Sequence, residues 1–350
     1  MQENLVCADA VFFKMQMGRW NIPFCRRTVQ ILVTIRSGVE KNEKVQRRGP
    51  KMEKQLVLKT SGLQKKFGRR RAVSNLNMTI SEGEIYGFIG RNGAGKTTFM
   101  RMIVGTAFPS AGKIELFGGE RLSTARRKIG SLIETPTFYP NCTARENMKR
   151  FSTLFGGSEE DIERILATVG LADTGRKKVK SFSLGMKQRL GIALALLGHP
   201  EFLLLDEPAN GLDPTGIKEI RDLILKLNQE SGITFLISSH LLDELSKVVT
   251  RYGIIDKGVL VEEISREELQ EKCRQKLMIT VDDPQKALEI LSTEIDPQDL
   301  SVEDSTIVIT SHFNDAALLN QLLCARGVMV SGLTMQSYDL EQYFMERIGE

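Results

Sequence analysis

The chain has 350 residues, 41% of them hydrophobic and 26% charged, which fits a globular protein with one large domain and a smaller one. The net charge of +4 comes from residues 1–51, where ten Lys or Arg face four Asp or Glu; the rest carries −2 and lacks the basic surface that nucleic acids require. No run approaches the ~18 consecutive apolar residues of a membrane-spanning helix, so we expect any membrane function to need a second polypeptide. The five cysteines form no CxxC pair, which argues against a disulfide framework or a zinc site.

The first 51 residues differ from the rest of the chain. They show no sustained period of 2 or 3.6 residues. The apolar run at 30–35 is too short to be the core of a signal peptide. A regular pattern begins only after Met52. We therefore interpret residues 1–51 as either a disordered arm or an extension that is not part of the natural protein.

Residues 52–263 alternate short apolar segments with helical ones. The runs 84–89, 202–205 and 233–237 are apolar, as parallel strands buried on both faces are. Residues 216–227 carry apolar side chains at helical spacing. Thr143 and Glu146 have the spacing of a capping box, which marks a helix start. This alternation predicts an α/β domain whose helices pack on the faces of a parallel sheet.

Residues 264–350 read as a separate small α+β unit after a break that follows Val261. We predict strands at 277–281, 306–310 and 328–330 and a helix at 314–323. A last helix carries an apolar stripe, which we interpret as core packing; its members are Leu340, Tyr343, Phe344 and Ile348. The unit has no cluster of nucleophile, base and metal ligands, so we expect it to be accessory.

The segment Gly90-Arg-Asn-Gly-Ala-Gly-Lys-Thr97 matches the pattern GxxxxGK(S/T) between a predicted strand and a predicted helix. The N–H groups of such a loop and of the helix start suit a phosphate group. We expect Lys96 to contact the β- and γ-phosphates of ATP and to take part in catalysis, and Thr97 to ligate Mg²⁺. The remaining loop residues expected to bind the nucleotide are Gly90, Asn92, Gly93, Ala94, Gly95 and Thr98.

A second motif is the apolar run 203–205, which ends in Asp206 and Glu207. The carboxyl ends of parallel strands lie at the sheet edge where α/β proteins bind their ligands. We expect Asp206 to hold Mg²⁺ through water and Glu207 to polarise the attacking water. The motif follows Lys96 by 110 residues, and the two motifs together predict a P-loop NTPase.

Shortly before the second motif, Ser181-Phe-Ser-Leu-Gly-Met-Lys-Gln-Arg189 resembles the LSGGQ signature of ABC ATPases, although Leu184 and Met186 depart from it. The matching residues are Ser183, Gly185, Gln188 and Arg189. The resemblance covers about residues 55–262. It implies an antiparallel β subdomain and a helical subdomain beside the parallel sheet. It also implies that Ser183 and Gly185 serve the γ-phosphate of ATP bound to a second subunit, either another copy or a paralogue.

The resemblance assigns roles to further residues. Phe67 takes the place of the aromatic residue that stacks on adenine. Asp213 ends Asn210-Gly-Leu-Asp213, which resembles the D-loop at the dimer interface. His240 resembles the switch histidine that contacts the γ-phosphate during catalysis. Glu134 stands where most ABC ATPases have glutamine, in the loop towards the membrane subunit. We expect it to approach Mg²⁺ in the closed state and to act chiefly in coupling.

Glu134, the following Thr-Pro-Thr-Phe-Tyr-Pro140 and the C-terminal unit resemble the ABC transporter subgroup that exports or excludes antimicrobial peptides, including bacitracin and lantibiotics. This implies an ATPase subunit that pairs with separate transmembrane permease subunits at the cytoplasmic face of the plasma membrane. The transported substrate and its direction do not follow from the residues themselves. The alternative is a soluble regulatory ABC ATPase without transport. Ribosome-associated relatives carry two cassettes and chromosome ATPases a long coiled coil, whereas this chain has one P-loop and only 87 positions between Lys96 and Ser183.

Overall fold

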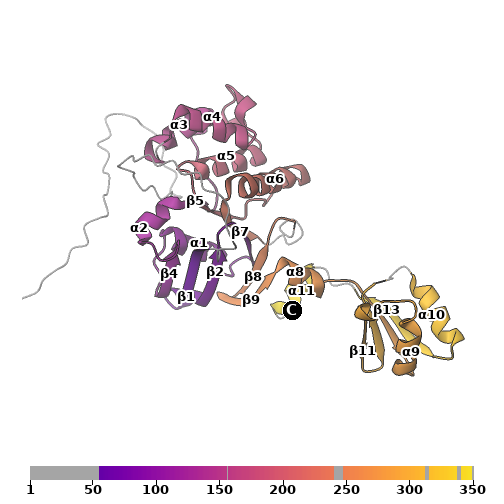
Figure 1. The fold of residues 1–350 in the computed structure, drawn as a ribbon. Coiled ribbons are helices and arrows are strands. Elements are labelled where there is room, and N and C mark those ends of the chain that lie inside the picture. The colour runs from indigo at the N-terminus through magenta and orange to yellow at the C-terminus, as the bar shows by residue number, and fades with distance from the viewer. Residues whose placement is uncertain (1–54, 156, 240–246, 312–314, 337–339, 349–350) are drawn as a thin grey trace, which may run out of the picture.

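The computed structural model describes residues 55–350 except 156, 240–246, 312–314, 337–339 and 349–350 (Figure 1). Residues 1–51, interpreted from the sequence as either a disordered arm or an extension that is not part of the natural protein, lie outside the described part of the chain. Among the described helices, none has both the length and the apolar character needed to cross a membrane.

The central element is a six-stranded sheet with the order β5-β6-β7-β3-β8-β9, in which β9 alone is antiparallel to its neighbour. Its strands are β5 (Ile129–Leu132), β6 (Phe202–Asp206), β7 (Thr234–Ser239), β3 (Ile85–Ile89), β8 (Arg251–Asp256) and β9 (Val259–Ser265). Successive residues of β6 pack into different hydrophobic clusters, Leu204 on one face and Leu203 and Leu205 on the other. The apolar runs are thus confirmed as strands buried on both faces.

One face of this sheet is covered by α1 (Lys96–Val104) and by a three-stranded antiparallel sheet with the order β2-β1-β4. That sheet consists of β1 (Leu56–Phe67), β2 (Arg70–Ser81) and β4 (Ala111–Leu116), and the short α2 (Leu122–Ala125) follows it. The three-stranded sheet shares a buried cluster with β3 and β6.

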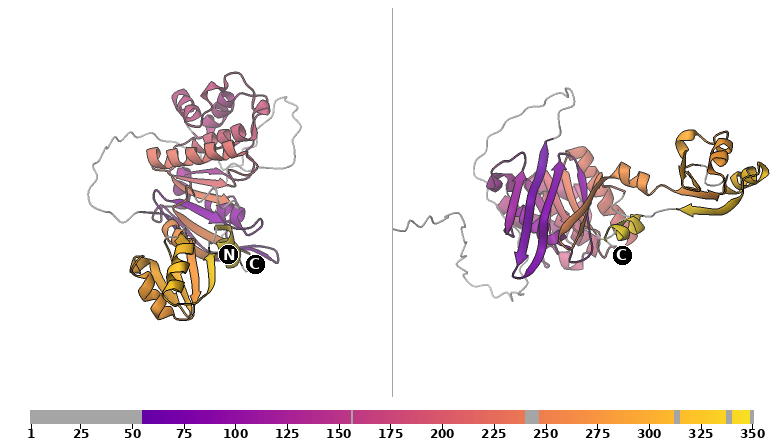
Figure 2. Two further views of the ribbon diagram at one scale, coloured as in Figure 1. Left: turned by 90° about the vertical axis from the view of Figure 1, so that its right-hand side faces the viewer. Right: turned by 90° about the horizontal axis from the view of Figure 1, so that it is seen from below.

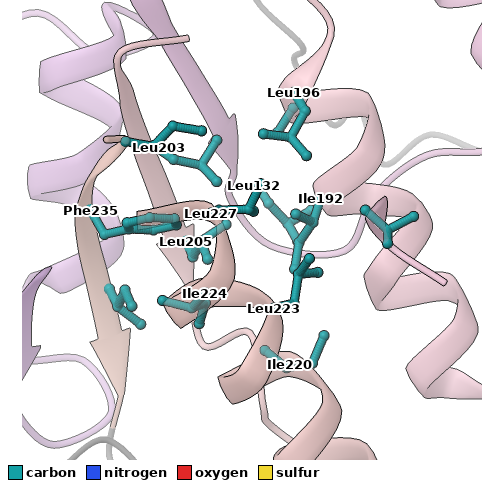
Figure 3. Close-up of a cluster of buried hydrophobic side chains, with 14 of the residues drawn as sticks. Leu132, Ile192, Leu196, Leu203, Leu205, Ile220, Leu223, Ile224, Leu227 and Phe235 are labelled. Carbon is teal, nitrogen blue, oxygen red and sulfur yellow. The ribbon is translucent and has the colours of Figure 1, made fainter. Parts of the chain in front are cut away.

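The opposite face is covered by helices, and Figure 3 shows the leucine and isoleucine side chains of α5 and α6 against β6 and β7. The helices next to the sheet are α5 (Leu184–Leu196) and α6 (Pro214–Ser231), and α3 (Ala144–Phe155) and α4 (Glu159–Thr168) pack on α5 as a helical subdomain. The capping box is confirmed, because the Thr143 N–H lies 2.7 Å from the Glu146 carboxylate and the Glu146 N–H lies 3.1 Å from the Thr143 hydroxyl. The predicted fold class, with its parallel sheet, β subdomain and helical subdomain, is confirmed.

The C-terminal unit has a second sheet with the order β11-β12-β10-β13, antiparallel throughout. In chain order its elements are β10 (Lys276–Val281), α9 (Pro284–Leu291), β11 (Leu300–Glu303), β12 (Thr306–Ile309), α10 (Ala316–Ala325) and β13 (Val330–Gln336). This is the split βαβ arrangement βαββαβ. The strand predicted at 328–330 was misplaced, because β13 begins only at Val330, and β11 and α9 were not predicted.

The connection between the two parts differs from the sequence prediction. The prediction of a break after Val261 is wrong. β9 continues to Ser265, which pairs with Arg251 of β8, and the chain then enters α8 (Arg266–Lys272). The last helix, α11 (Leu340–Arg347), does carry a buried stripe, but Tyr343 and Phe344 join the cluster of the large sheet. Figures 1 and 2 show the small unit projecting from the large one while α11 returns to the large one.

Candidate nucleotide-binding site

The loop between β3 and α1 is built from glycines because other strands approach it closely. A Cβ atom at Gly90 would lie 2.4 Å from the carbonyl oxygen of Ile255 on β8. At Gly95, which has a φ of +114°, a Cβ atom would lie 2.4 Å from the carbonyl oxygen of Ala72 on β2. Only glycine fits both positions. Both sheets therefore fix the shape of the loop that was predicted to bind phosphate.

The loop delivers the chain to the start of α1, where Gly95 is the N-cap and supplies no capping side chain. The first-turn N–H groups of Lys96, Thr97 and Thr98 have no acceptor one turn earlier in the helix. No acidic side chain lies in that first turn. The N–H groups and the positive end of the helix dipole together suit an anion such as a phosphate.

Lys96 is the buried cation of this loop, with only 5% of its side chain exposed. Its ammonium group donates a hydrogen bond to the carbonyl of Gly90 and lies 3.4 Å from the carbonyl oxygen of Arg91. Its Nζ atom also lies 3.1 Å from Oε1 of Glu207. A phosphate that enters the loop can replace this carboxylate as the partner of the ammonium group.

Asp206 ends β6 and is held by hydroxyl groups from two other elements. The Thr97 hydroxyl donates to Oδ2 of Asp206 over 2.7 Å, and the Ser238 hydroxyl donates to Oδ1. Ser238 lies opposite Asp206 on β7 and also accepts the N–H of Glu207 at 3.0 Å. Ser238 was not predicted from the sequence. The signal for it was the Ser238-Ser239 pair at the end of an apolar strand.

Glu207 follows Asp206 in a backbone conformation that is uncommon for residues other than glycine, with a φ of +51°. The turn brings its carboxylate to Lys96. A cleft of about 450 Å³ lies over the P-loop. Its lining includes Phe67, Asn92, Gly93, Gly95, Lys96, Thr97, Thr98 and Glu207. Gly90 and Ala94, also predicted to bind nucleotide, are buried and are not among those lining residues.

Phe67 is 55% exposed, and Nζ of Lys65 lies 4.8 Å from the centre of its ring. The ring lies at the end of β1 and lines the cleft that the P-loop lines. An exposed aromatic ring beside a phosphate-binding loop can stack on a nucleotide base.

The other predicted site residues lie elsewhere. Ser183 is the N-cap of α5 and its hydroxyl accepts the N–H of Met186 over 3.2 Å, a bond that does not use the hydroxyl proton. Asp213 caps α6 by accepting the N–H of Gly216 over 3.1 Å. Neither Ser183, Gly185 nor Asp213 lines the P-loop cleft as the described residues form it. His240 lies outside the described residues.

Glu134 lies in a second cleft, of about 520 Å³, which it shares with Asp206, Glu207 and Gln188. Its φ of +64° is left-handed, and its carboxylate forms an ion pair with the guanidinium group of Arg101 on α1. Arg101 was not singled out from the sequence, where nothing distinguishes it from any other helix-surface arginine. Beside this pair runs a groove of about 330 Å³ between α1 and β5 and the helices α3 and α5.

Comparison with known proteins agrees with this geometry. A protein-family model described as ABC transporter matches residues 73–210. The bacitracin transport ATP-binding protein BcrA of Bacillus licheniformis is 44% identical over 298 residues, which cover 84% of this chain and 97% of BcrA. The lantibiotic transport ATP-binding protein SrtF of Streptococcus pyogenes is 45% identical over 205 residues, 59% of this chain and 89% of SrtF.

Among solved structures, the chain resembles a dimeric ATP-binding cassette in a post-hydrolysis state with bound ADP and Pi. The TM-score is 0.54 and the identity 26%, covering 60% of this chain and 98% of the cassette. The relationship to BcrA extends over nearly the whole of that protein, well beyond the motifs themselves. The chain therefore belongs to the ABC transporter family, as one of its ATP-binding and ATP-hydrolysing proteins.

Proposed function

We propose that this chain pairs with a second ATPase subunit, closes on ATP and Mg²⁺, and thereby powers a separate membrane permease that moves peptide antibiotics. The substrate class is supported by the relatives, which are named for bacitracin transport and lantibiotic transport. The permease would place the chain at the cytoplasmic face of the plasma membrane.

The residues of the P-loop cleft support the roles proposed in ATP hydrolysis. Lys96 and the first-turn N–H groups bind the β- and γ-phosphates, and Phe67 stacks on the adenine. Glu207 orients and polarises the water that attacks the γ-phosphorus, while the bond to the β–γ bridging oxygen breaks and ADP becomes the leaving group. His240 is proposed to contact the γ-phosphate during catalysis.

The donor set suits Mg²⁺ that arrives with the nucleotide. The described residues hold no group of three or more His, Cys, Asp or Glu side chains that could bind a metal by themselves. Mg²⁺ prefers oxygen ligands and keeps several waters and substrate phosphates in its shell, so a few protein oxygens are enough. Thr97 would hold the ion directly, Asp206 through water, and Glu134 would approach it in the closed state. When bound, the ion neutralises charge on the phosphate oxygens.

The observation that carries the two-subunit proposal is that the signature residues and the P-loop do not share a cleft. Ser183 and Gly185 start α5, while the cleft over the P-loop is lined by residues of β1, β2, the P-loop, α1 and the end of β6. A second subunit can place its own α5 start against that cleft and complete it. Two-fold symmetry then encloses two ATP molecules, as a self-complementary interface requires.

The groove beside Glu134 supports a permease contact. Its lining combines apolar residues, among them the rings of Phe151 and Phe155, with charged ones that include Arg101 and Glu134. Apolar grooves with a few charged groups are typical binding sites for short helices of a partner. Because Glu134 borders both this groove and the cleft of Asp206, movement of its loop can link the permease to the nucleotide.

The proposal is tested by isolating the chain from native membranes and by deleting its gene. We expect a membrane protein to accompany the chain, and the deletion to raise sensitivity to bacitracin or a lantibiotic. The wild-type chain should restore resistance, Glu207→Gln should not, and Glu134→Gln should restore it poorly while keeping ATPase activity within about tenfold. A chain found only in the cytosolic fraction, with unchanged resistance in the deletion strain, would instead support a soluble regulatory ATPase.

A further inference from the structure

Glu134 lies between the groove and the cleft that the proposed function connects. It lines the groove assigned to the permease and also the cleft that contains Asp206 and Glu207. In this structure its carboxylate is paired with Arg101, on the groove side. The residue assigned to coupling therefore has a defined partner away from the nucleotide.

That partner belongs to the same helix as the phosphate-binding lysine. Lys96 begins α1, and Arg101 lies about one and a half turns further along. Thr98, Arg101 and Val104 recur at a spacing of three and all line the groove, so this face of α1 is the groove face. One rigid helix thus presents Lys96 to the phosphates and Arg101 to the coupling loop.

The charges explain why Glu134 needs a cation there. Asp206 and Glu207 line the same cleft as Glu134, and the γ-phosphate of ATP adds further negative charge. Lys96 is already engaged by Glu207. Like charges that line one cleft repel one another, to an extent that solvent reduces for the half-exposed Glu134. Arg101 offsets the charge of Glu134 on the groove side, whereas Mg²⁺ can do so on the nucleotide side.

The backbone conformation of Glu134 also indicates that surrounding contacts keep this residue in place. Glu134 has a φ of +64°, a region that residues other than glycine populate sparsely and that persists where surrounding contacts maintain it. The ion pair with Arg101 is such a contact.

We propose that Arg101 is a positioning residue that keeps Glu134 on the groove side, and that Mg²⁺ bound with ATP competes with Arg101 for its carboxylate. The exchange moves the loop of residues 134–140 between the permease groove and the nucleotide. The inference rests on the proposed coupling role of Glu134, and the experiment below separates the two.

The test measures Mn²⁺ binding to the ATP-bound, slowly hydrolysing Glu207→Gln protein, with the free ion followed by electron paramagnetic resonance. Arg101→Gln should strengthen Mn²⁺ binding by about two- to fivefold, the range for the loss of one exposed ion pair that competes with the metal. Arg101→Lys keeps the charge and should restore most of the parent affinity. Arg164→Gln is the matched control, because Arg164 forms an exposed ion pair with Asp161 on α4.

The second arm repeats the measurement with Glu134→Gln. Alone, this change should weaken Mn²⁺ binding, and in its presence Arg101→Gln should have no further effect. If Glu134→Gln weakens binding but Arg101→Gln does not strengthen it, the exchange is refuted and the coupling role of Glu134 survives. If Glu134→Gln changes neither Mn²⁺ binding nor antibiotic resistance, the proposed role of Glu134 itself is wrong. An equal effect of Arg101→Gln with and without Glu134 would show that Arg101 acts by another route.

Discussion

Nζ of Lys96 lies 3.1 Å from Oε1 of Glu207, so the cation proposed to bind phosphate and the proposed base face each other directly across the P-loop cleft. A γ-phosphate carries more charge than a carboxylate and also receives the first-turn N–H groups of α1. It is therefore expected to displace Glu207 from Lys96. The displaced carboxylate then becomes available to a water molecule at the γ-phosphorus.

Glu207→Gln should lower the ATP hydrolysis rate by about 10²–10⁴-fold, the range for the loss of a general base. ATP binding should persist, because glutamine keeps the shape and removes a negative charge near the phosphates. The variant should form a dimer in size-exclusion chromatography when ATP and Mg²⁺ are present. Glu201→Gln, at the opposite end of β6, is the matched control and should hydrolyse ATP like the parent. A variant that stays monomeric with ATP and Mg²⁺ would count against the two-subunit site.

A deletion experiment follows from the return of α11 to the large unit. A chain that stops after Glu263 would lose α8 and the buried rings of Tyr343 and Phe344, each worth about 3–5 kcal/mol if truncated to alanine. Replacing residues 275–336 by a flexible Gly/Ser linker would instead remove the accessory sheet and keep both helices. We expect the linker variant to bind ATP and to unfold within a few degrees of the parent, and the stopped chain to unfold at a clearly lower temperature. Equal melting temperatures would show that α11 adds no stability.

The contact that holds α11 predicts a dependence on pH. Glu262 accepts a hydrogen bond from the Tyr343 hydroxyl at 2.9 Å and forms ion pairs with Lys272 and Arg347, each at 3.0 Å. Burial alone would raise the pKa of Glu262, but the hydrogen bonds from Lys272 and Tyr343 and the nearby positive charges outweigh it and lower the pKa. A lowered carboxyl pKa in the folded state stabilises the protein above the unfolded value of about 4.3. That contribution disappears as the pH falls through the folded pKa.

Thermal unfolding can measure this contribution. Glu262→Gln should lower the melting temperature at pH 7, and the difference from the parent should shrink towards about pH 3.5, below the ordinary glutamate pKa. Glu303→Gln, an exposed glutamate on β11, should give a small difference at both pH values. A difference for Glu262→Gln that stays constant with pH would mean that packing, and not charge, holds α11 in place.

The elements that were predicted from the sequence differ from those that were missed in how clearly a short segment of sequence shows them. The strands β3, β6 and β7 are buried on both faces, so their apolar runs are visible without knowledge of their neighbours. β11 is a four-residue edge strand with three exposed residues, so it shows no clear period. α9 does carry buried Ala287, Ile290 and Leu291 at helical spacing after an Asp N-cap and a first-turn proline, so its signals were present and were missed. The stripe of α11 predicted a buried face but could not tell which core it joins.

The residues of the candidate site also divide into those that a local motif reveals and those that meet only in the folded protein. The P-loop and the Asp206-Glu207 pair are local motifs whose residues follow one another along the chain. Arg101 and Glu134 are 33 positions apart and meet only because α1 and the end of β5 border one groove. Ser238 meets Asp206 because β6 and β7 pair in parallel register. Such partners depend on tertiary packing, which a single sequence does not display.

The last prediction concerns Phe67, whose ring is 55% exposed and lines the P-loop cleft. Because stacking of a base on an aromatic side chain is typically worth ~1–3 kcal/mol, Phe67→Ala should weaken ATP binding by roughly tenfold to a hundredfold in calorimetric titration. Phe67→Tyr keeps the ring and should bind like the parent. Phe108→Ala is the matched control, because Phe108 is 77% exposed and is not among the residues that line this cleft.

A second ligand separates stacking from damage to the phosphate site. Inorganic triphosphate offers the phosphate groups of ATP without a base, so its affinity should depend on Lys96 and the N–H groups of α1 and not on Phe67. We therefore expect Phe67→Ala to weaken ATP binding and leave triphosphate binding unchanged. Equal weakening of both ligands would mean that the substitution disturbs the P-loop. Unchanged affinity for both would show that adenine is held elsewhere and that Phe67 is only an exposed ring at the end of β1.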